Sequence, residues 1–285
     1  MAFKKQQKGM LEALEAYHRS LSIGKDKEKY FDETNNIPQD QRVRYQASWN
    51  NTEAFFESKG RSDFTDTIYF DDGKKGIEGV VGIFKNKVAI SFLASNSEYD
   101  WKINLDWPKK EVPYAGMGRS KIRVHSGYMS HYRDMRLKIL ELVTNLVAAT
   151  GINKVLITGH SLGGAIAQLF ALDLDYNYGE ALNLSVEGFS FGSPRLGNGA
   201  FRESFNKRMS KRFTNVHYGN EFTSKYPFWF FGFRHIGASA DKTKYNLRHP
   251  NIFFWFSIKD HYFWNYVNGW LHQSKEDFDP PVEFK

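Results

Sequence analysis

The stretch Gly159-His160-Ser161-Leu162-Gly163 constrains this chain more than any other part of its sequence. It follows residues 154–158 (KVLIT), a short apolar run that predicts a buried strand of a parallel sheet. It precedes residues 165–174 (AIAQLFALDL), which predict a helix. A G-x-S-x-G sequence between a strand and a helix is typical of a nucleophile elbow, a tight turn that presents a serine hydroxyl. The pattern therefore indicates Ser161 as a nucleophile.

The glycines of this stretch have a physical reason. The backbone turns sharply at the serine, so we expect a Cβ at Gly159 or Gly163 to clash with the neighbouring strand or helix. The turn also places Ser161 at the N-terminus of the next helix, where free N–H groups and the helix dipole favour developing negative charge. The alternative, a glycine-rich structural turn with an incidental serine, is disfavoured by the strand–turn–helix context.

Patterning elsewhere predicts an α/β fold, with a mostly parallel central sheet and helices on both of its faces. Residues 79–84 and 88–92 are short β-rich runs separated by a hairpin turn at 85–87. A long helix is expected over residues 136–149 and a further strand over 184–191.

The first 70 residues differ from the rest of the chain. Residues 10–21 have helical spacing, residues 25–36 are polar and charged, and residues 45–56 are a weaker helix candidate. We therefore expect an N-terminal helical extension over residues 1–70 and an α/β domain over residues 71–285.

Composition excludes several classes of protein. Hydrophobic residues make up 41% of the chain, which favours a globular fold over disorder. Cysteine is absent, so disulfides and thiolate metal sites are excluded. Residues 1–10 are polar and basic, unlike a signal peptide, and no apolar run approaches the length of a membrane span. These features favour a cytoplasmic protein or one that is peripheral at a membrane surface.

The formal net charge of +7 suits attraction to anionic lipid or nucleic acid. Lysine and arginine are scattered, however, so an ordinary basic surface is the simpler interpretation. No phosphate-binding, dinucleotide or metal motif is present. We therefore expect no cofactor, no metal and no nucleic-acid partner.

Further motifs occur in order along the chain. G-H-S-L-G-G at 159–164 is followed by F-G-S-P-R-L-G-N at 191–198, F-G-F-R-H-I-G at 231–237 and D-H-Y-F at 260–263. On these motifs the chain resembles the class 3 (fungal-type) lipase family from about residue 80 to about residue 266. The resemblance implies an α/β-hydrolase fold for residues 71–285 and serine-dependent hydrolysis of carboxylic esters. The first 70 residues carry no resemblance of this kind.

A serine nucleophile needs a general base, and in α/β-hydrolases the acid and then the histidine follow the serine along the chain. Four histidines compete for the role of base: His217, His235, His249 and His261. The resemblance implies His261, which lies in the D-H motif.

The acid of the triad has three candidates. The family has an Asp in a segment close to N-x-x-D-x-V-P-x-x-P, and the matching stretch here is HYGNEFTSKYP at 217–227. Counting back from Pro227 places Glu221 at the Asp position, with Asn220 there if the register slips by one. Asp241 is a third candidate. Glu221 is favoured because it alone is both acidic and in register, and α/β-hydrolases use either acid.

An oxyanion hole needs two N–H donors. One is the backbone N–H of Leu162, the residue after the nucleophile. The resemblance implies Ser95 as the second, although the family's F-R-G-[ST] is replaced here by F-L-A-S at 92–95. The alternative for Ser95 is an ordinary turn serine.

A lid is the next feature that the resemblance implies. Residues 97–105 form a possible short lid helix whose apolar side chains are Trp101, Ile103 and Leu105. A fixed surface helix is the alternative. The aromatic run at 226–233 (YPFWFFGF) either lines an acyl pocket, touches a lipid interface or belongs to the core.

The sequence therefore predicts a serine ester hydrolase whose substrate is a lipid ester or a small ester, with contact to a lipid interface also open. Two alternatives remain: a phospholipase or non-lipid esterase of the same fold, and an inactive homologue that binds lipid.

Overall fold

The computed structural model describes residues 2–24, 39–71, 77–93, 109–111, 122–219, 221–236, 244–247, 261 and 263–274. A seven-stranded sheet forms its centre, in the order β1-β2-β3-β6-β7-β8-β9. The first three strands pair antiparallel, and β3, β6, β7, β8 and β9 pair parallel, so the predicted mostly parallel sheet is confirmed. The strands are β1 (Thr65–Asp71), β2 (Glu78–Phe84), β3 (Lys87–Leu93), β6 (Lys154–His160), β7 (Ser185–Phe191), β8 (Phe213–Tyr218) and β9 (Lys244–Leu247).

The predicted hairpin joins β2 to β3. Lys85 and Asn86 form the turn with φ values of 47° and 59°. Positive φ at both central residues is the backbone of a tight hairpin turn whose twist matches that of the strands. Phe84 pairs with Lys87 directly across it. A separate two-stranded pair, β4 (Lys109–Glu111) and β5 (Arg123–His125), lies outside the main sheet.

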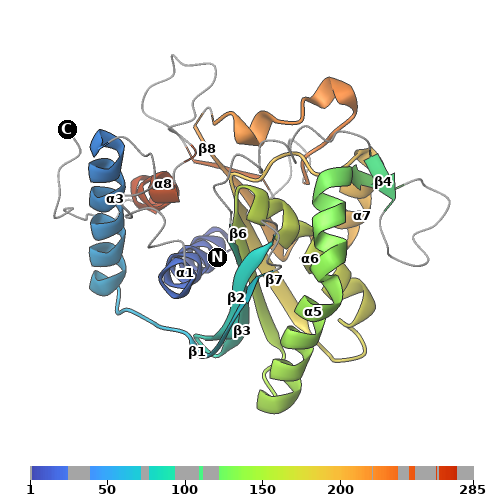
Figure 1. The fold of residues 1–285 in the computed structure, drawn as a ribbon, viewed down its shortest axis with the longest axis horizontal. Helices are drawn as coiled ribbons and strands as arrows, with labels where there is room; N and C mark the ends of the chain where they lie inside the picture. The colour runs from blue at the N-terminus through green and yellow to red at the C-terminus, as the bar shows by residue number, and fades with distance from the viewer. Residues whose placement is uncertain are drawn as a thin grey trace.

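Helices cover both faces of the sheet, as Figure 1 shows. Side chains alternate between the faces of a strand, and Ile90 and Ile157 face one core while Ala89 and Leu156 face the other. The helices α5 (Ser126–Thr150), α6 (Leu162–Asn177) and α7 (Gly199–Met209) cover the first face, and α1 (Ala2–Ile23), α3 (Gln39–Ser58) and α8 (Phe263–Ser274) cover the second.

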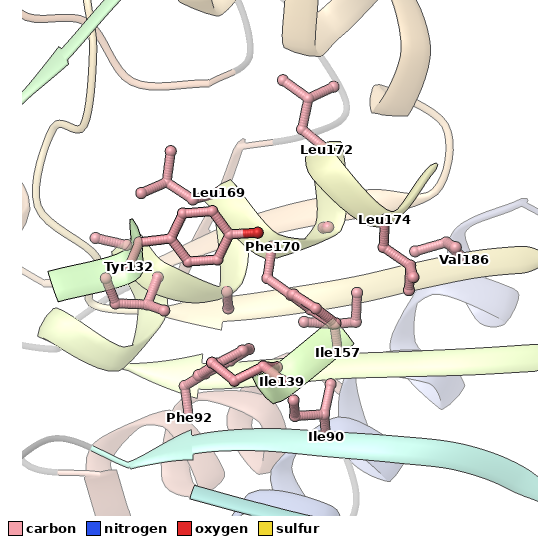
Figure 2. Close-up of a cluster of buried hydrophobic side chains, with 14 of the residues drawn as sticks. Ile90, Phe92, Tyr132, Ile139, Ile157, Leu169, Phe170, Leu172, Leu174 and Val186 are labelled. Carbon is pink, nitrogen blue, oxygen red and sulfur yellow. The ribbon is translucent and has the colours of Figure 1, made fainter. Parts of the chain in front are cut away.

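The first core is the larger one. The ring of Phe170 from α6 packs on that of Phe92 from β3 with centroids 5.5 Å apart (Figure 2). Tyr132 and Ile139 of α5 complete this layer, and both are fully buried. Helix α6 therefore packs on both the sheet and α5, and its N-terminus lies directly after β6.

Helix α5 is longer than the sequence predicts, because it begins at Ser126 instead of residue 136. The segment before residue 136 contains Ser126, Gly127 and several aromatic residues, which are weak helix formers. Burial overrides that preference, since Tyr128, Met129 and Tyr132 are all buried in the core.

The N-terminal helices belong to the second core. Leu14 and Ala13 of α1 are fully buried against strand residues, among them Phe189 and Leu156. Trp270 of α8 donates a hydrogen bond from Nε1 to the carbonyl oxygen of Gln7, over 3.0 Å. The expected boundary near residue 70 falls inside β1.

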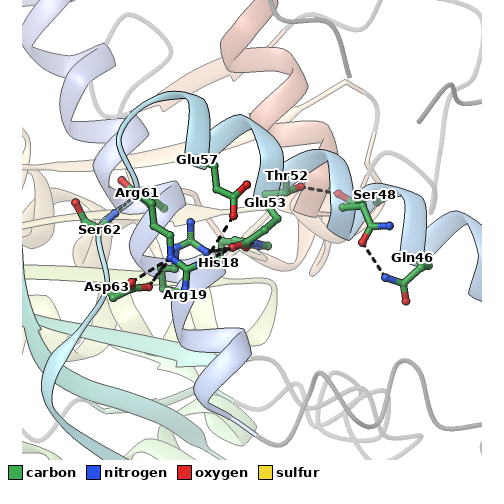
Figure 3. Close-up of polar contacts among 12 residues, drawn as sticks. His18, Arg19, Gln46, Ser48, Thr52, Glu53, Glu57, Arg61, Ser62 and Asp63 are labelled. Atoms are coloured by element: carbon green, nitrogen blue, oxygen red, sulfur yellow. Dashed lines mark hydrogen bonds and ion pairs between the residues drawn. The ribbon is translucent and has the colours of Figure 1, made fainter. Parts of the chain in front are cut away.

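A network of charged side chains joins α1 to α3 (Figure 3). Glu53 of α3 accepts hydrogen bonds from Arg19 Nη1 at 2.5 and 2.6 Å, and it lies 2.8 Å from Nε2 of His18. The hydrogen bond with His18 lowers the pKa of Glu53 to about 2, with Arg19 acting in the same direction against the effect of burial. Arg19 is only 3% exposed, so Glu53 neutralises a buried cation.

None of the helices that the structure describes is long and apolar enough to cross a membrane.

Candidate active site

Ser161 stands at the junction of β6 and α6 with a strained backbone. Its φ and ψ are 56° and −126°, a conformation that costs a residue with a side chain about 1–3 kcal/mol. Its N–H donates to the carbonyl oxygen of Phe191 over 2.9 Å, and its carbonyl accepts from the N–H of Gly164 over 3.0 Å. Hydrogen bonds to β7 and to α6 thus hold the serine in the strained turn that the motif predicts.

The expected role of the two glycines is confirmed. A Cβ on Gly159 would overlap the carbonyl oxygen of Gly163, and a Cβ on Gly163 would overlap that of Phe92 in β3. Both overlaps are with backbone atoms, which cannot move aside easily. The elbow therefore requires glycine at these two positions.

His261 and Glu221 are hydrogen-bonded to each other. Nδ1 of His261 lies 2.9 Å from Oε2 of Glu221. Because an ionised carboxylate only accepts, Nδ1 carries the proton, and Nε2 is left as the acceptor of the neutral ring. Nε2 is buried and has no hydrogen-bond partner among the described residues. The ring is therefore oriented by an acid and presents a free lone pair.

Glu221 is fully buried, and its carboxylate is surrounded by donors. Oε1 accepts from the N–H of Tyr218 over 3.1 Å and lies 3.5 Å from Nδ1 of His217. Oε2 also accepts from the hydroxyl of Tyr266. Burial raises the pKa of Glu221, but hydrogen bonds with His217 and His261 outweigh it and lower the pKa to about 2. The acid is therefore ionised at neutral pH.

His160, the residue before the serine, contacts His261 directly. Its Nε2 donates to the backbone carbonyl oxygen of His261 over 2.8 Å, and the two rings stack with centroids 4.5 Å apart. Burial, and then the neighbouring imidazole of His261, lower the pKa of His160 to about 3. His160 is therefore neutral at neutral pH and acts as a hydrogen-bond donor to the backbone.

The turn after β7 brings the elbow and the histidine–acid pair together. Phe191 accepts the hydrogen bond from Ser161, and Gly192 follows with a φ of 59°. A Cβ on Gly192 would lie 2.7 Å from Oε2 of Glu221 and 2.8 Å from Cε1 of His261. One short turn thus touches the backbone of the serine on one side and the His261–Glu221 pair on the other.

Two of the competing histidines are described: His217 lies against Oε1 of the same Glu221, and His235 has its partners elsewhere. His235 lies 3.3 Å from the side-chain amide of Asn215 through Nδ1, and its Nε2 hydrogen-bonds the carbonyl oxygen of Ser224. His217 packs on His235 with ring centroids 4.4 Å apart. His249 lies outside the described residues.

Several other predicted residues also lie outside the described part of the chain: Ser95, Trp101, Ile103, Leu105, Asn220 and Asp241. Their roles in an oxyanion hole, a lid or the acid position remain predictions. Leu162 is described, and it is the first residue of α6.

The aromatic run at 226–233 divides between the core and the surface. Tyr226 and Phe233 at its two ends are buried. Between them, the short helix η2 (Trp229–Phe231) is exposed. The core interpretation is therefore confirmed for Tyr226 and Phe233, whereas contact of the exposed residues with a lipid interface or an acyl pocket stays a prediction.

Two residues at the site were not identified from the sequence. Tyr266 is the hydroxyl donor to Glu221, and its position five residues after His261, where α8 begins, was an available signal. Tyr17 of α1 packs against Phe263 and His160, with ring centroids 4.7 and 5.9 Å apart. No local pattern connects Tyr17 to residues so distant in the chain.

The family model for class 3 lipases matches residues 89–231, half of the chain, and the chain therefore belongs to the class 3 lipase family. Within that family, it is similar to a secreted mono- and diacylglycerol lipase, LIP4, of Malassezia restricta, at 27% identity over 64% of this chain and 54% of the relative. The chloroplastic phospholipase A(1) DAD1 of Arabidopsis thaliana is 32% identical over 47% of this chain and 32% of its own length.

A Rhizomucor miehei lipase is 34% identical over 42% of this chain and 32% of its own. The chain spans about half the length of the first of these curated relatives, or less for the others.

Solved structures share the fold. A Rhizomucor miehei lipase–propeptide complex has a TM-score of 0.57 at 20% identity, covering 80% of this chain and 81% of its own. A lipase from Rhizopus microsporus var. chinensis has a TM-score of 0.59 at 20% identity, covering 91% of this chain and 86% of its own. The expected α/β-hydrolase fold is thereby confirmed.

Proposed function

We propose that this protein is a serine-dependent carboxylic-ester hydrolase that acts on lipid esters, with Ser161, His261 and Glu221 as its catalytic residues. The observation that carries this proposal is the hydrogen bond between His261 and buried Glu221, which lies beside the strained elbow at Ser161. Membership of the class 3 lipase family supports the same chemistry.

The proposed reaction begins with proton transfer from Ser161. Nε2 of His261 is the unprotonated ring nitrogen, so it accepts the hydroxyl proton as Oγ attacks the ester carbonyl. The imidazolium then gives this proton to the leaving alcohol, and an acyl-enzyme forms. In the second half, His261 takes a proton from water as the water oxygen attacks the acyl carbonyl. The bond to Oγ of Ser161 then breaks, Oγ takes the proton back from the imidazolium, and the carboxylic acid leaves.

Glu221 stabilises the imidazolium that forms in each half of the reaction. Its low pKa keeps it ionised, and its hydrogen bond to Nδ1 maintains the tautomer that leaves Nε2 free. Developing charge on the substrate oxygen is stabilised by the backbone N–H of Leu162 at the start of α6, with Ser95 as the second proposed donor.

The names of the relatives point to the substrate class. Mono- and diacylglycerol lipases and a phospholipase A(1) are among them, so we propose acylglycerols or phospholipids as substrates. The relative LIP4 is named as secreted, which differs from the cytoplasmic location expected for this chain. A location at a lipid surface is compatible with both substrates and is the one that we propose.

Hydrolysis of p-nitrophenyl butyrate and p-nitrophenyl palmitate tests the proposal. We expect activity in the wild type, none in Ser161→Ala, and a reduction of about 10²–10⁴-fold in Glu221→Gln. A fluorophosphonate probe should label the wild type and leave Ser161→Ala unlabelled. A folded wild type that neither hydrolyses these esters or emulsified lipid nor reacts with the probe would instead be an inactive homologue.

A further inference from the structure

Three consecutive aromatic side chains form an exposed surface on the short helix η2. Trp229, Phe230 and Phe231 are 63%, 62% and 41% exposed, and we refer to them as the aromatic triplet. Rings of this size contribute much apolar area, which proteins normally bury. Contiguous exposure of three such rings therefore marks an interaction surface rather than an ordinary part of the exterior.

The backbone beneath the aromatic triplet is held in place. Nη1 of Arg234 donates to the carbonyl oxygens of Trp229 and Phe233 over 2.6 and 2.8 Å. Nη1 of Arg195 donates to the carbonyl oxygen of Pro227 over 3.2 Å. The rings of Phe228 and Phe230 stack with centroids 5.3 Å apart. The rings are thus presented outward from a braced turn, which reduces the entropy lost on binding.

The chain segment that carries the aromatic triplet is positively charged. Lys225 and Arg234 are the charged residues of the segment 222–236, which contains no Asp or Glu. Arg195 lies close by, since its Nη1 donates to the carbonyl oxygens of Lys225 and Pro227. The whole chain carries a formal charge of +7. Aromatic side chains flanked by basic ones suit the boundary between acyl chains and anionic headgroups.

The location of the aromatic triplet relates it to the elbow. The segment that carries η2, orange in Figure 1, lies at the end of the sheet where the parallel strands β6 and β8 finish. Ser161 follows the last residue of β6 at that same end. A flat partner that contacts the aromatic triplet would therefore face the edge of the sheet that carries the serine.

We propose that the aromatic triplet docks this protein on an anionic lipid surface, with the three rings inserted at the headgroup level and the neighbouring cations facing the lipid charge. The exposure of the three rings, the bracing of their turn and the positive charge of the segment support this docking. It does not require that the protein hydrolyse esters. The competing occupant, a second copy of this chain, would bury the rings without any dependence on lipid charge.

Vesicle sedimentation tests this docking with the full chain carrying Ser161→Ala, so that the lipid stays intact. Two vesicle types are compared: pure phosphatidylcholine, and phosphatidylcholine in which about a third of the lipid is phosphatidylserine. The variant Trp229→Ala/Phe230→Ala/Phe231→Ala removes the triplet, and Trp229→Ala alone serves if the triple variant does not fold. The matched control is Ile68→Ala/Leu137→Ala/Leu182→Ala, whose residues are 42%, 71% and 39% exposed elsewhere on the surface.

We expect binding to the anionic vesicles to exceed binding to neutral ones, and to weaken in high salt. Loss of the triplet should weaken it by about 10-fold or more, since interfacial affinity scales with buried apolar area. Lys225→Gln should reduce the preference for anionic vesicles, and the control variant should bind like the parent. Equal binding to both vesicle types, or equal losses in the triplet and control variants, would overturn the proposal.

Two further measurements distinguish lipid docking from self-association and from the proposed ester hydrolysis. Light scattering across protein concentrations detects self-association, and a dimer that dissociates on loss of the triplet, together with no vesicle binding, would overturn lipid docking. Hydrolysis of soluble p-nitrophenyl butyrate is measured on the same substitutions with Ser161 intact. Unchanged hydrolysis by the triplet variant is expected, whereas vesicle binding without any hydrolysis would refute the proposed function and leave the docking surface standing.

Discussion

His160 donates a hydrogen bond to the backbone carbonyl oxygen of His261, and their rings stack face to face, so the residue before the proposed nucleophile holds the proposed base. Because burial lowers the pKa of His160 to about 3, this donor keeps its form throughout the neutral range. The contact is thus a fixed link between β6 and the segment that carries His261.

Removal of this link should reduce turnover more than substrate binding. We expect His160→Ala to lower kcat on p-nitrophenyl butyrate by about 10–100-fold, because misplacement of a catalytic group is costly even when it remains present. His160→Gln keeps a donor of similar reach and should recover part of the loss. If both variants retain wild-type kcat, His160 serves only to pack the elbow.

The buried acid makes stability depend on pH. The pKa of Glu221 is lowered from 4.5 to about 2 in the folded protein, so its stabilising effect is complete above about pH 4.5 and is lost as the pH falls toward 2. This shift corresponds to a contribution of about 3 kcal/mol at neutral pH. Denaturant unfolding of the wild type and Glu221→Gln from neutral to acidic pH measures it. As the pH falls from about 4.5 toward 2, the wild type should lose free energy of unfolding relative to Glu221→Gln. A difference between the two proteins that is independent of pH would contradict the assignment.

Tyr266 should act by positioning Glu221. Tyr266→Phe keeps the ring, which is fully buried, and removes the hydroxyl that donates to Oε2. Hydrogen bonds to charged groups contribute about 1.5–3 kcal/mol, so we expect a loss of stability of that order. The hydroxyl of Tyr266 also helps to fix the carboxylate of Glu221 against His261. Its removal should therefore move the acidic limb of the kcat/KM profile against pH. A stability loss with an unchanged pH profile would assign Tyr266 a purely structural role.

Helix α1 should be indispensable to the proposed site. Tyr17 is 2% exposed and packs on His160 and Phe263, which lie next to the serine and the histidine. Tyr17→Ala should therefore cost about 3–5 kcal/mol, the usual range for removing a large buried aromatic side chain. Tyr17→Phe retains the packing and is the control. Thermal unfolding and activity, measured together, would show no change in either variant if α1 were a dispensable appendage.

Local patterns were sufficient for much of the fold. The elbow, the β2–β3 hairpin and the β6–α6–β7 unit each contain their determining residues within a short stretch, and all of them form as predicted. The predicted start of α5 was wrong because the burial of Tyr128 and Tyr132 outweighs the weak helix propensity of that segment.

Long-range relationships were harder to predict. Glu221 was chosen by counting back from Pro227, and the structure places its carboxylate on His261. Tyr17 and Tyr266 were missed because their partners lie far away in the chain, and helical spacing indicates that a face is buried without indicating what covers it.

The hydrogen bond from Trp270 to the carbonyl of Gln7 spans 263 residues, and it has a consequence for biosynthesis. Helix α1 is synthesised well before α8, which completes the same layer of the core. Until residue 270 has been synthesised, the apolar face that includes Phe189 and Phe191 is only partly covered. A growing chain with such an uncovered face is prone to aggregate, so we expect this protein to complete its fold only after translation has passed α8 and to depend on chaperones before then.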